Sequence, residues 1–154
     1  AFYTELSSMI NNKEVTAKID VFYGNSKINT GNYMNNYVDI ADIMQFNPSG
    51  NNVVQNIGAT QAGKLIHEFS EQFAKASQGI SKGSNSGYNR NHQIGIQSEN
   101  RVNGNTRLND TQPQRGVYQT NYRERDGSNT SVRMSNNNSG ILSVQQRKPR
   151  GKMR

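Results

Sequence analysis

The residues best suited to chemistry lie in one short stretch, Leu65 to Phe73, which reads LIHEFSEQF. His67 and Glu71 stand four positions apart, so on a helix their side chains lie on the same face. One helix supplies two metal ligands at this spacing in the HExxH pattern. Glu68 stands where that pattern has the general base that activates water. The stretch therefore predicts a metal-dependent hydrolytic site.

The ligand set departs from the HExxH pattern at one position. Glu71 stands where most zinc hydrolases of this type have a second histidine, although a carboxylate oxygen also ligates zinc. The third ligand must come from elsewhere, and His92 is the only other histidine in the chain. Glu99 follows His92 by seven residues, two turns along the same face if residues 90–100 are helical. We therefore expect His67, Glu71 and His92 to converge and to hold zinc.

A second interpretation of the same helix needs no chemistry. Lys64 with Glu68, and Glu71 with Lys75, form ordinary i,i+4 ion pairs worth about 0.2–0.5 kcal/mol each. These side chains and His67 fall opposite the apolar stripe of the helix. On this interpretation the polar face is solvated, and the domain is a binding or structural module.

The element that must position these residues is a helix over residues 58–77. Its apolar side chains recur at helical spacing and should face a sheet: Ala62, Leu65, Ile66, Phe69, Phe73 and Ala76. We expect Ile66, Phe69 and Phe73 to be buried against two predicted strands, residues 15–23 and 37–46. The alternation of the second strand slips near Ala41, which indicates a bulge or a strand end.

The remaining pattern predicts an α+β fold, in which a small mixed sheet packs on a central amphipathic helix. Short helices are expected over residues 2–11 and 90–100, and a turn over 47–50. Three further strands, near residues 116–124, 130–134 and 141–146, form a C-terminal antiparallel β-meander with turns at 126–127 and 136–140. Because Asn and other polar residues dominate after residue 80, we expect the second half to be rich in loops.

Composition excludes several classes of protein. The chain has 154 residues, of which 31% are hydrophobic, so one domain with a lean core is expected. The absence of cysteine excludes disulfides, thiolate nucleophiles and cysteine zinc sites. No apolar run is long enough to span a membrane. A Walker loop, a dinucleotide fingerprint and a Gly-x-Ser-x-Gly elbow are all missing.

Charge is distributed unevenly along the chain. Residues 1–99 carry seven Lys and Arg against eight acids, whereas residues 100–154 carry eleven against three. We expect one domain over residues 1–146 and a basic, disordered tail over 147–154, which orders only against an anionic partner. The anionic partner would be either nucleic acid or an acidic protein surface. The metal-dependent hydrolase expected from the HExxE helix would be a zincin-like peptidase. A metal-independent RNase that uses His67 and His92 as its acid–base pair is the alternative.

The segments YVDIADIMQF, GKLIHEFSEQF and NHQIGIQSENRVNG resemble the C-terminal toxin domains of Rhs-repeat polymorphic toxins. In those domains a strand precedes a helix with the pattern His-Glu-x-x-Glu-Gln, and a His and a Glu-Asn pair follow. The resemblance covers residues 37–107 and matches His67, Glu68, Glu71, Gln72, His92, Glu99 and Asn100. Arg107, at the end of this region, is a further candidate site residue.

The resemblance implies a biological setting. The domain would be an antibacterial or host-directed effector that is secreted as part of a parent Rhs shell. It would then be released and delivered into the cytoplasm of a target cell. The sequence begins with Ala1 and not with methionine, as expected for a domain released from a larger protein. A cognate immunity protein is then expected as a partner and a protein as the substrate. The reaction stays open, because such toxin domains include nucleases, ADP-ribosyltransferases and peptidases.

Overall fold

The computed structural model describes residues 1–25, 30–46, 58–135 and 141–149. Within these ranges it contains helices and two sheets, which confirms the predicted α+β class. No helix among them is long and apolar enough to cross a membrane. In chain order the elements are α1 (Phe2–Ile10), β1 (Asp20–Phe22), β2 (Gly31–Asn32), β3 (Tyr37–Asp39), α2 (Ile40–Met44), α3 (Gln61–Ser77), α4 (Tyr88–Asn103), β4 (Thr106–Gln114), β5 (Val117–Arg123), β6 (Asn129–Ser135) and β7 (Ile141–Arg147).

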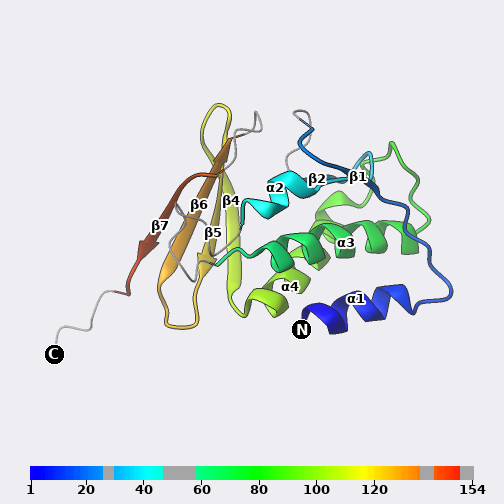
Figure 1. Cartoon of the computed structure of the whole chain (residues 1–154), viewed down its shortest axis with the longest axis horizontal. Coiled ribbons are helices and arrows are strands. Elements are labelled where there is room, and N and C mark those ends of the chain that lie inside the picture. The colour runs from blue at the N-terminus through cyan, green and yellow to red at the C-terminus, as the bar shows by residue number, and fades with distance from the viewer. Residues whose placement is uncertain (26–29, 47–57, 136–140, 150–154) are drawn as a thin grey trace.

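The two sheets differ in size and in strand direction. The small sheet has the order β1-β3-β2, with β1 parallel and β2 antiparallel to β3. The second sheet is the antiparallel meander β4-β5-β6-β7. Figure 1 shows the meander at one end of the molecule and α1, α3 and α4 stacked beside one another at the other. A hydrophobic cluster covers the inner face of the meander and comprises Phe46, Ala59, Tyr122, Val132 and Met134.

Both strands predicted in the first third of the chain are shorter than expected. Only Asp20–Phe22 of residues 15–23 is a strand. The strand that begins at Tyr37 ends at Asp39, whose carboxylate accepts hydrogen bonds from the N–H groups of Ala41 and Asp42. This is helix N-capping, so the slip near Ala41 marks the start of α2 and not a bulge. The turn predicted at 47–50 lies outside the described residues.

The prediction of a loop-rich second half was wrong. The predicted meander strands are present as β5, β6 and β7, and α4 spans the segment 90–100. The polar segment Thr106–Gln114 is a further strand, β4, which pairs with β5 at the edge of the sheet. Most of its residues are exposed, so it has no alternating apolar pattern to reveal it. Arg147 is the last residue of β7; the turn at 136–140 and residues 150–154 lie outside the described ranges.

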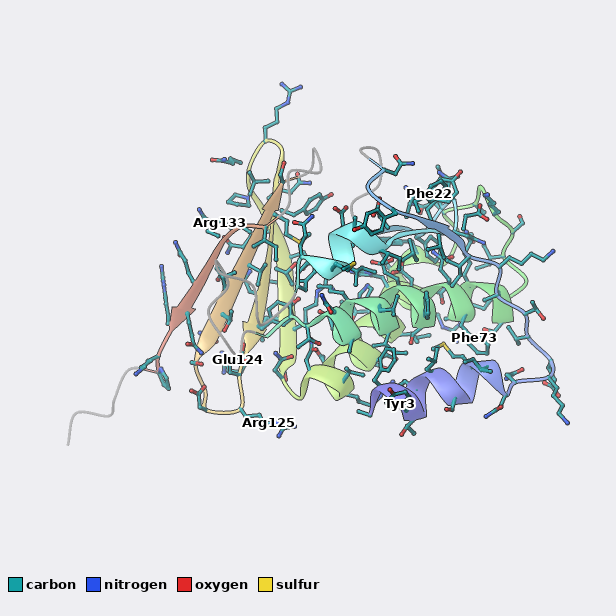
Figure 2. All side chains as sticks on the ribbon, viewed as in Figure 1. Tyr3, Phe22, Phe73, Glu124, Arg125 and Arg133 are labelled. Carbon is teal, nitrogen blue, oxygen red and sulfur yellow. The ribbon has the colours of Figure 1, made fainter. Side chains whose placement is uncertain are left out.

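Helix α3 buries its polar face more deeply than its apolar stripe. Ile66 is fully buried as predicted, but Phe69 and Phe73 are only half-buried, and Figure 2 shows Phe73 on the side of α3 that faces α1. The most buried positions are largely polar: Lys64, His67, Glu68, Ser70, Glu71, Gln72 and Lys75. The interpretation of this face as solvated is therefore wrong.

The two ion pairs expected along that face are replaced by contacts with other elements. Lys64 Nζ lies 2.9 Å from Glu99 Oε1 on α4. Lys75 Nζ donates hydrogen bonds to the carbonyl oxygens of Tyr33 and Met34, at 2.8 and 3.0 Å. The polar face is buried because α4 and the segment around β2 cover it, and because each cation finds an acceptor there.

Candidate functional site

Three potential metal ligands from two helices meet at one point. His67 and Glu71 lie on α3, and His92 lies on the first turns of α4. His67 Nε2 is 3.2 Å from His92 Nδ1 and 3.3 Å from Glu71 Oε2, which is 3.5 Å from His92 Nδ1. The predicted convergence of these side chains is confirmed. Together they could hold a metal ion.

Glu99 fixes the far side of the His67 ring. Its Oε2 lies 3.0 Å from His67 Nδ1. A carboxylate can only accept a hydrogen bond, and Glu71 lies farther from Nε2, at 3.3 Å. The shorter contact with Glu99 therefore favours the proton of a neutral His67 on Nδ1, with the Nε2 lone pair on the side of His92 and Glu71. Glu99 therefore lies behind the His67 ring and is not one of the three side chains that could hold a metal ion.

The Glu99 carboxylate is fully buried and surrounded by donors. Oε1 accepts from Tyr122 Oη at 2.9 Å and pairs with Lys64, while Oε2 accepts from Arg107 Nη1 at 2.7 Å. Burial by itself opposes ionisation, but Lys64, Arg107 and His67 hold the pKa of Glu99 well below its usual range. Glu99 is therefore a buried anion that stays ionised to a lower pH than an ordinary glutamate.

His92 has a comparable but looser environment. Its Nε2 lies 3.8 Å from Asp110 Oδ2, and its ring stacks on Tyr88 with the centroids 5.1 Å apart. Burial lowers the pKa of His92, whereas Asp110 and Glu71 raise it more strongly, to about 9. A metal ion that binds Nδ1 must therefore displace a proton from this ring at neutral pH.

Glu68 faces the small sheet from the adjacent position on α3. Its Oε1 accepts from Thr30 Oγ1 at 3.3 Å, and a Cβ at Gly31 would lie 1.9 Å from its Oε2. Any larger residue at position 31 would therefore force the Glu68 carboxylate to move from this position. Burial, opposed chiefly by His67, raises the pKa of Glu68 to about 7.

One cavity connects these groups. It has a volume of about 330 Å³ and is lined by residues of β2, α3, α4, β4, β5 and β6. Ionisable side chains form much of its wall: His67, Glu68, Glu71, His92, Arg107 and Asp110. Glu68 and the three converging side chains thus line the same cavity.

No protein-family model, curated protein or solved structure matches this chain. Its function must be inferred from the site itself.

Five of the site residues proposed from the sequence line the cavity, namely His67, Glu68, Glu71, His92 and Arg107, but the other lining residues were not identified. Asn100 does not line the cavity; its Oδ1 accepts from the N–H of Arg107 at 2.7 Å and so anchors the start of β4. Asp110 and Tyr88 were missed. Asp110 lies in a strand that the sequence pattern does not predict. Nothing in the sequence around Tyr88 indicates that its ring stacks on His92.

Gly95 sets the distance between the two helices at the site. A Cβ at this position would lie 2.9 Å from the backbone oxygen of His67 and 3.2 Å from its ring. Alanine raises helix propensity by about 1 kcal/mol, but overpacking typically costs about 1–3 kcal/mol. We expect Gly95→Ala to lower the midpoint of chemical denaturation, and Gln97→Ala, at an exposed position of α4, to leave it unchanged. A Gly95→Ala variant more stable than the wild type would contradict this close approach.

Proposed function

We propose that the domain is a zinc-dependent hydrolase in which His67, Glu71 and His92 bind the metal. The observation that carries the proposal is the spacing of the three ligand atoms, 3.2, 3.3 and 3.5 Å. Ligands at about 2.0–2.1 Å from a tetrahedral zinc ion lie about 3.3 Å from one another. Two imidazoles with one carboxylate also suit zinc better than magnesium, which prefers oxygen ligands in an octahedron.

Two further features of the donor set fit a cation. Glu71 Oε1 is buried and has no hydrogen-bond partner within the part of the chain that the structure describes. A buried carboxylate oxygen without a donor is costly, and a bound cation would offset that cost. The contact of Glu99 with His67 Nδ1 is the carboxylate–histidine arrangement that supports metal-binding imidazoles.

Three protein ligands leave one tetrahedral position for water or substrate, which is typical of catalytic rather than structural zinc. When bound, zinc would polarise a carbonyl oxygen and lower the pKa of water. Glu68 lines the same cavity and would act as the general base. Its carboxylate would take the proton of the attacking water and return it to the nitrogen of the leaving amine as the C–N bond breaks.

The favoured substrate is a protein. Strand β2, at the edge of the small sheet, lines the cavity beside Glu68. Edge strands bind extended peptides through main-chain hydrogen bonds. Together with the resemblance to Rhs-type toxin domains, this favours an effector peptidase that acts in the cytoplasm of a target cell and is neutralised by an immunity protein.

A two-histidine nuclease has less support. An acid and a base that act on opposite sides of one phosphate need room for that phosphate between them. His67 and His92 instead lie at hydrogen-bond distance from each other. The cavity cations Lys64 and Arg107 are both engaged by carboxylates, which reduces their capacity to hold a phosphate.

Metal analysis of the purified domain tests the proposal. We expect about one zinc ion per chain, and its loss from His92→Ala with the circular dichroism spectrum retained. Gln93→Ala, next to His92 on the exposed side of α4, is the matched control and should keep the metal. A wild-type domain that takes up no zinc, even from zinc-containing buffer, would rule out the zinc hydrolase.

A further inference from the structure

An irregularity in β4 brings two charged residues to the same face of the sheet. In a regular strand, Arg107 and Asp110 would point to opposite faces, because they are three residues apart. The pairing of β4 with β5 shifts between Arg107 and Asn109, so that Arg107 lies opposite Tyr122 and Asp110 opposite Thr120. This is a β-bulge at Leu108. Because of it, both charged side chains reach the cavity.

Arg107 joins two carboxylates that would otherwise be separate. Its Nη1 lies 2.7 Å from Glu99 Oε2, and its Nη2 and Nε lie 2.5 and 3.2 Å from the two oxygens of Asp110. Only 8% of the Arg107 side chain is exposed. The planar fork of a guanidinium is suited to two such contacts at once, whereas the ammonium of lysine is not.

Each of these carboxylates in turn contacts one of the converging histidines. Glu99 Oε2 lies 3.0 Å from His67 Nδ1, and Asp110 Oδ2 lies 3.8 Å from His92 Nε2. Arg107 Nη1 also approaches His67 Nδ1, at 3.3 Å. Arg107 and a protonated Nδ1 can both donate to Glu99 Oε2, whereas an unprotonated Nδ1 would direct its lone pair at that anion. Glu71 Oε2 lies farther from the other ring nitrogen, Nε2, at 3.3 Å. The proton of His67 is therefore favoured on Nδ1.

We infer that Arg107 is a positioning residue of the zinc site, which locks the carboxylates behind both histidines and so fixes which nitrogen each ring presents to the metal. This inference rests on the proposed function. His67 then offers Nε2 and His92 offers Nδ1, the two atoms that lie nearest to Glu71. Arg107 does not bind the metal itself, because a guanidinium has no free lone pair.

Competitive zinc titration with a chromogenic chelator tests the inference. We expect Arg107→Gln to weaken zinc binding about 10–100-fold, the usual cost of losing an outer-shell partner. Arg107→Lys keeps the buried charge but not the fork, so it should recover only part of the loss. The matched control is Arg123→Gln on β5, whose exposed side chain is held by Asn129 Oδ1 and should not affect affinity.

A second measurement distinguishes a general loss of structure from a loss of positioning. In the metal-free wild type, ¹⁵N chemical shifts of the imidazoles should report a proton on His67 Nδ1. In Arg107→Gln, or in Arg107→Lys if the Gln variant does not fold, the two tautomers should mix.

The inference is overturned if both variants bind zinc within about twofold of the wild type, or if the tautomer of His67 is unchanged in them. If the wild type itself binds no zinc, the proposed function fails. The tautomer measurement then still decides the role of Arg107.

Discussion

Glu68→Gln should abolish hydrolysis while leaving the zinc content of the domain unchanged. The amide cannot accept the proton of the attacking water, and loss of a general base typically lowers the rate by about 10²–10⁴-fold. The side chain keeps its size, so the close approach to Gly31 is preserved. Expression of the domain inside bacterial cells, followed by growth curves and metal analysis, measures both effects together.

The controls for this variant separate the candidate functions. Glu71→Gln should lose zinc and toxicity together, because it removes a ligand. If Glu68→Gln stays fully toxic while His67→Ala loses toxicity, water activation by Glu68 is refuted. A reaction that depends on the histidines then gains support. If no variant of these residues changes toxicity, the cavity is not the active site.

Replacement of Glu99 by alanine should produce the largest loss of stability. The change leaves Lys64 and Arg107 buried without their shared counter-charge, and removes the acceptor for Tyr122. Breaking a buried ion pair in this way typically costs about 3–5 kcal/mol, a large part of the total stability of a domain. Urea denaturation followed by circular dichroism measures the loss. Glu14→Ala, at an exposed position, should have little effect.

The same carboxylate makes stability depend on pH in a defined direction. The pKa of Glu99 is lowered in the folded state. Its contribution is therefore complete above the pKa of an unfolded glutamate, and it is lost as the pH falls towards the folded pKa. Denaturation midpoints of the wild type should fall with acidification below about pH 4.5. Those of Glu99→Ala should fall less, and parallel curves for the two proteins would contradict this role.

The sequence was sufficient to predict the fold class, the main helix and the convergence of its histidine with His92. These features follow from local periodicity and from the scarcity of histidine. The buried face of α3 could not be predicted in this way. Apolar spacing indicates which side of a helix avoids water, but His67, Glu68 and Glu71 are buried because partners from α4 and the segment around β2 satisfy them.

The residues that β4 contributes to the site could not be predicted from a local sequence pattern either. Asp110 lies within an exposed, polar edge strand, and only the bulge at Leu108 brings it to the face that Arg107 occupies. A bulge is defined by how two strands pair, and a single strand does not encode it in an obvious way. The pairing of Arg107 with both carboxylates is thus a property of the sheet.

The polar character of the contact between α3 and α4 affects how the domain responds to temperature. Much of the surface buried on α3 is polar or charged. Exposure of polar surface on unfolding lowers the heat-capacity change, whereas exposure of apolar surface raises it. We therefore expect a smaller heat-capacity change, and a flatter stability curve, than for a domain whose helices meet through apolar side chains. Cold, which weakens hydrophobic contacts most, would loosen the inner face of the meander before it separates the two helices that carry the site.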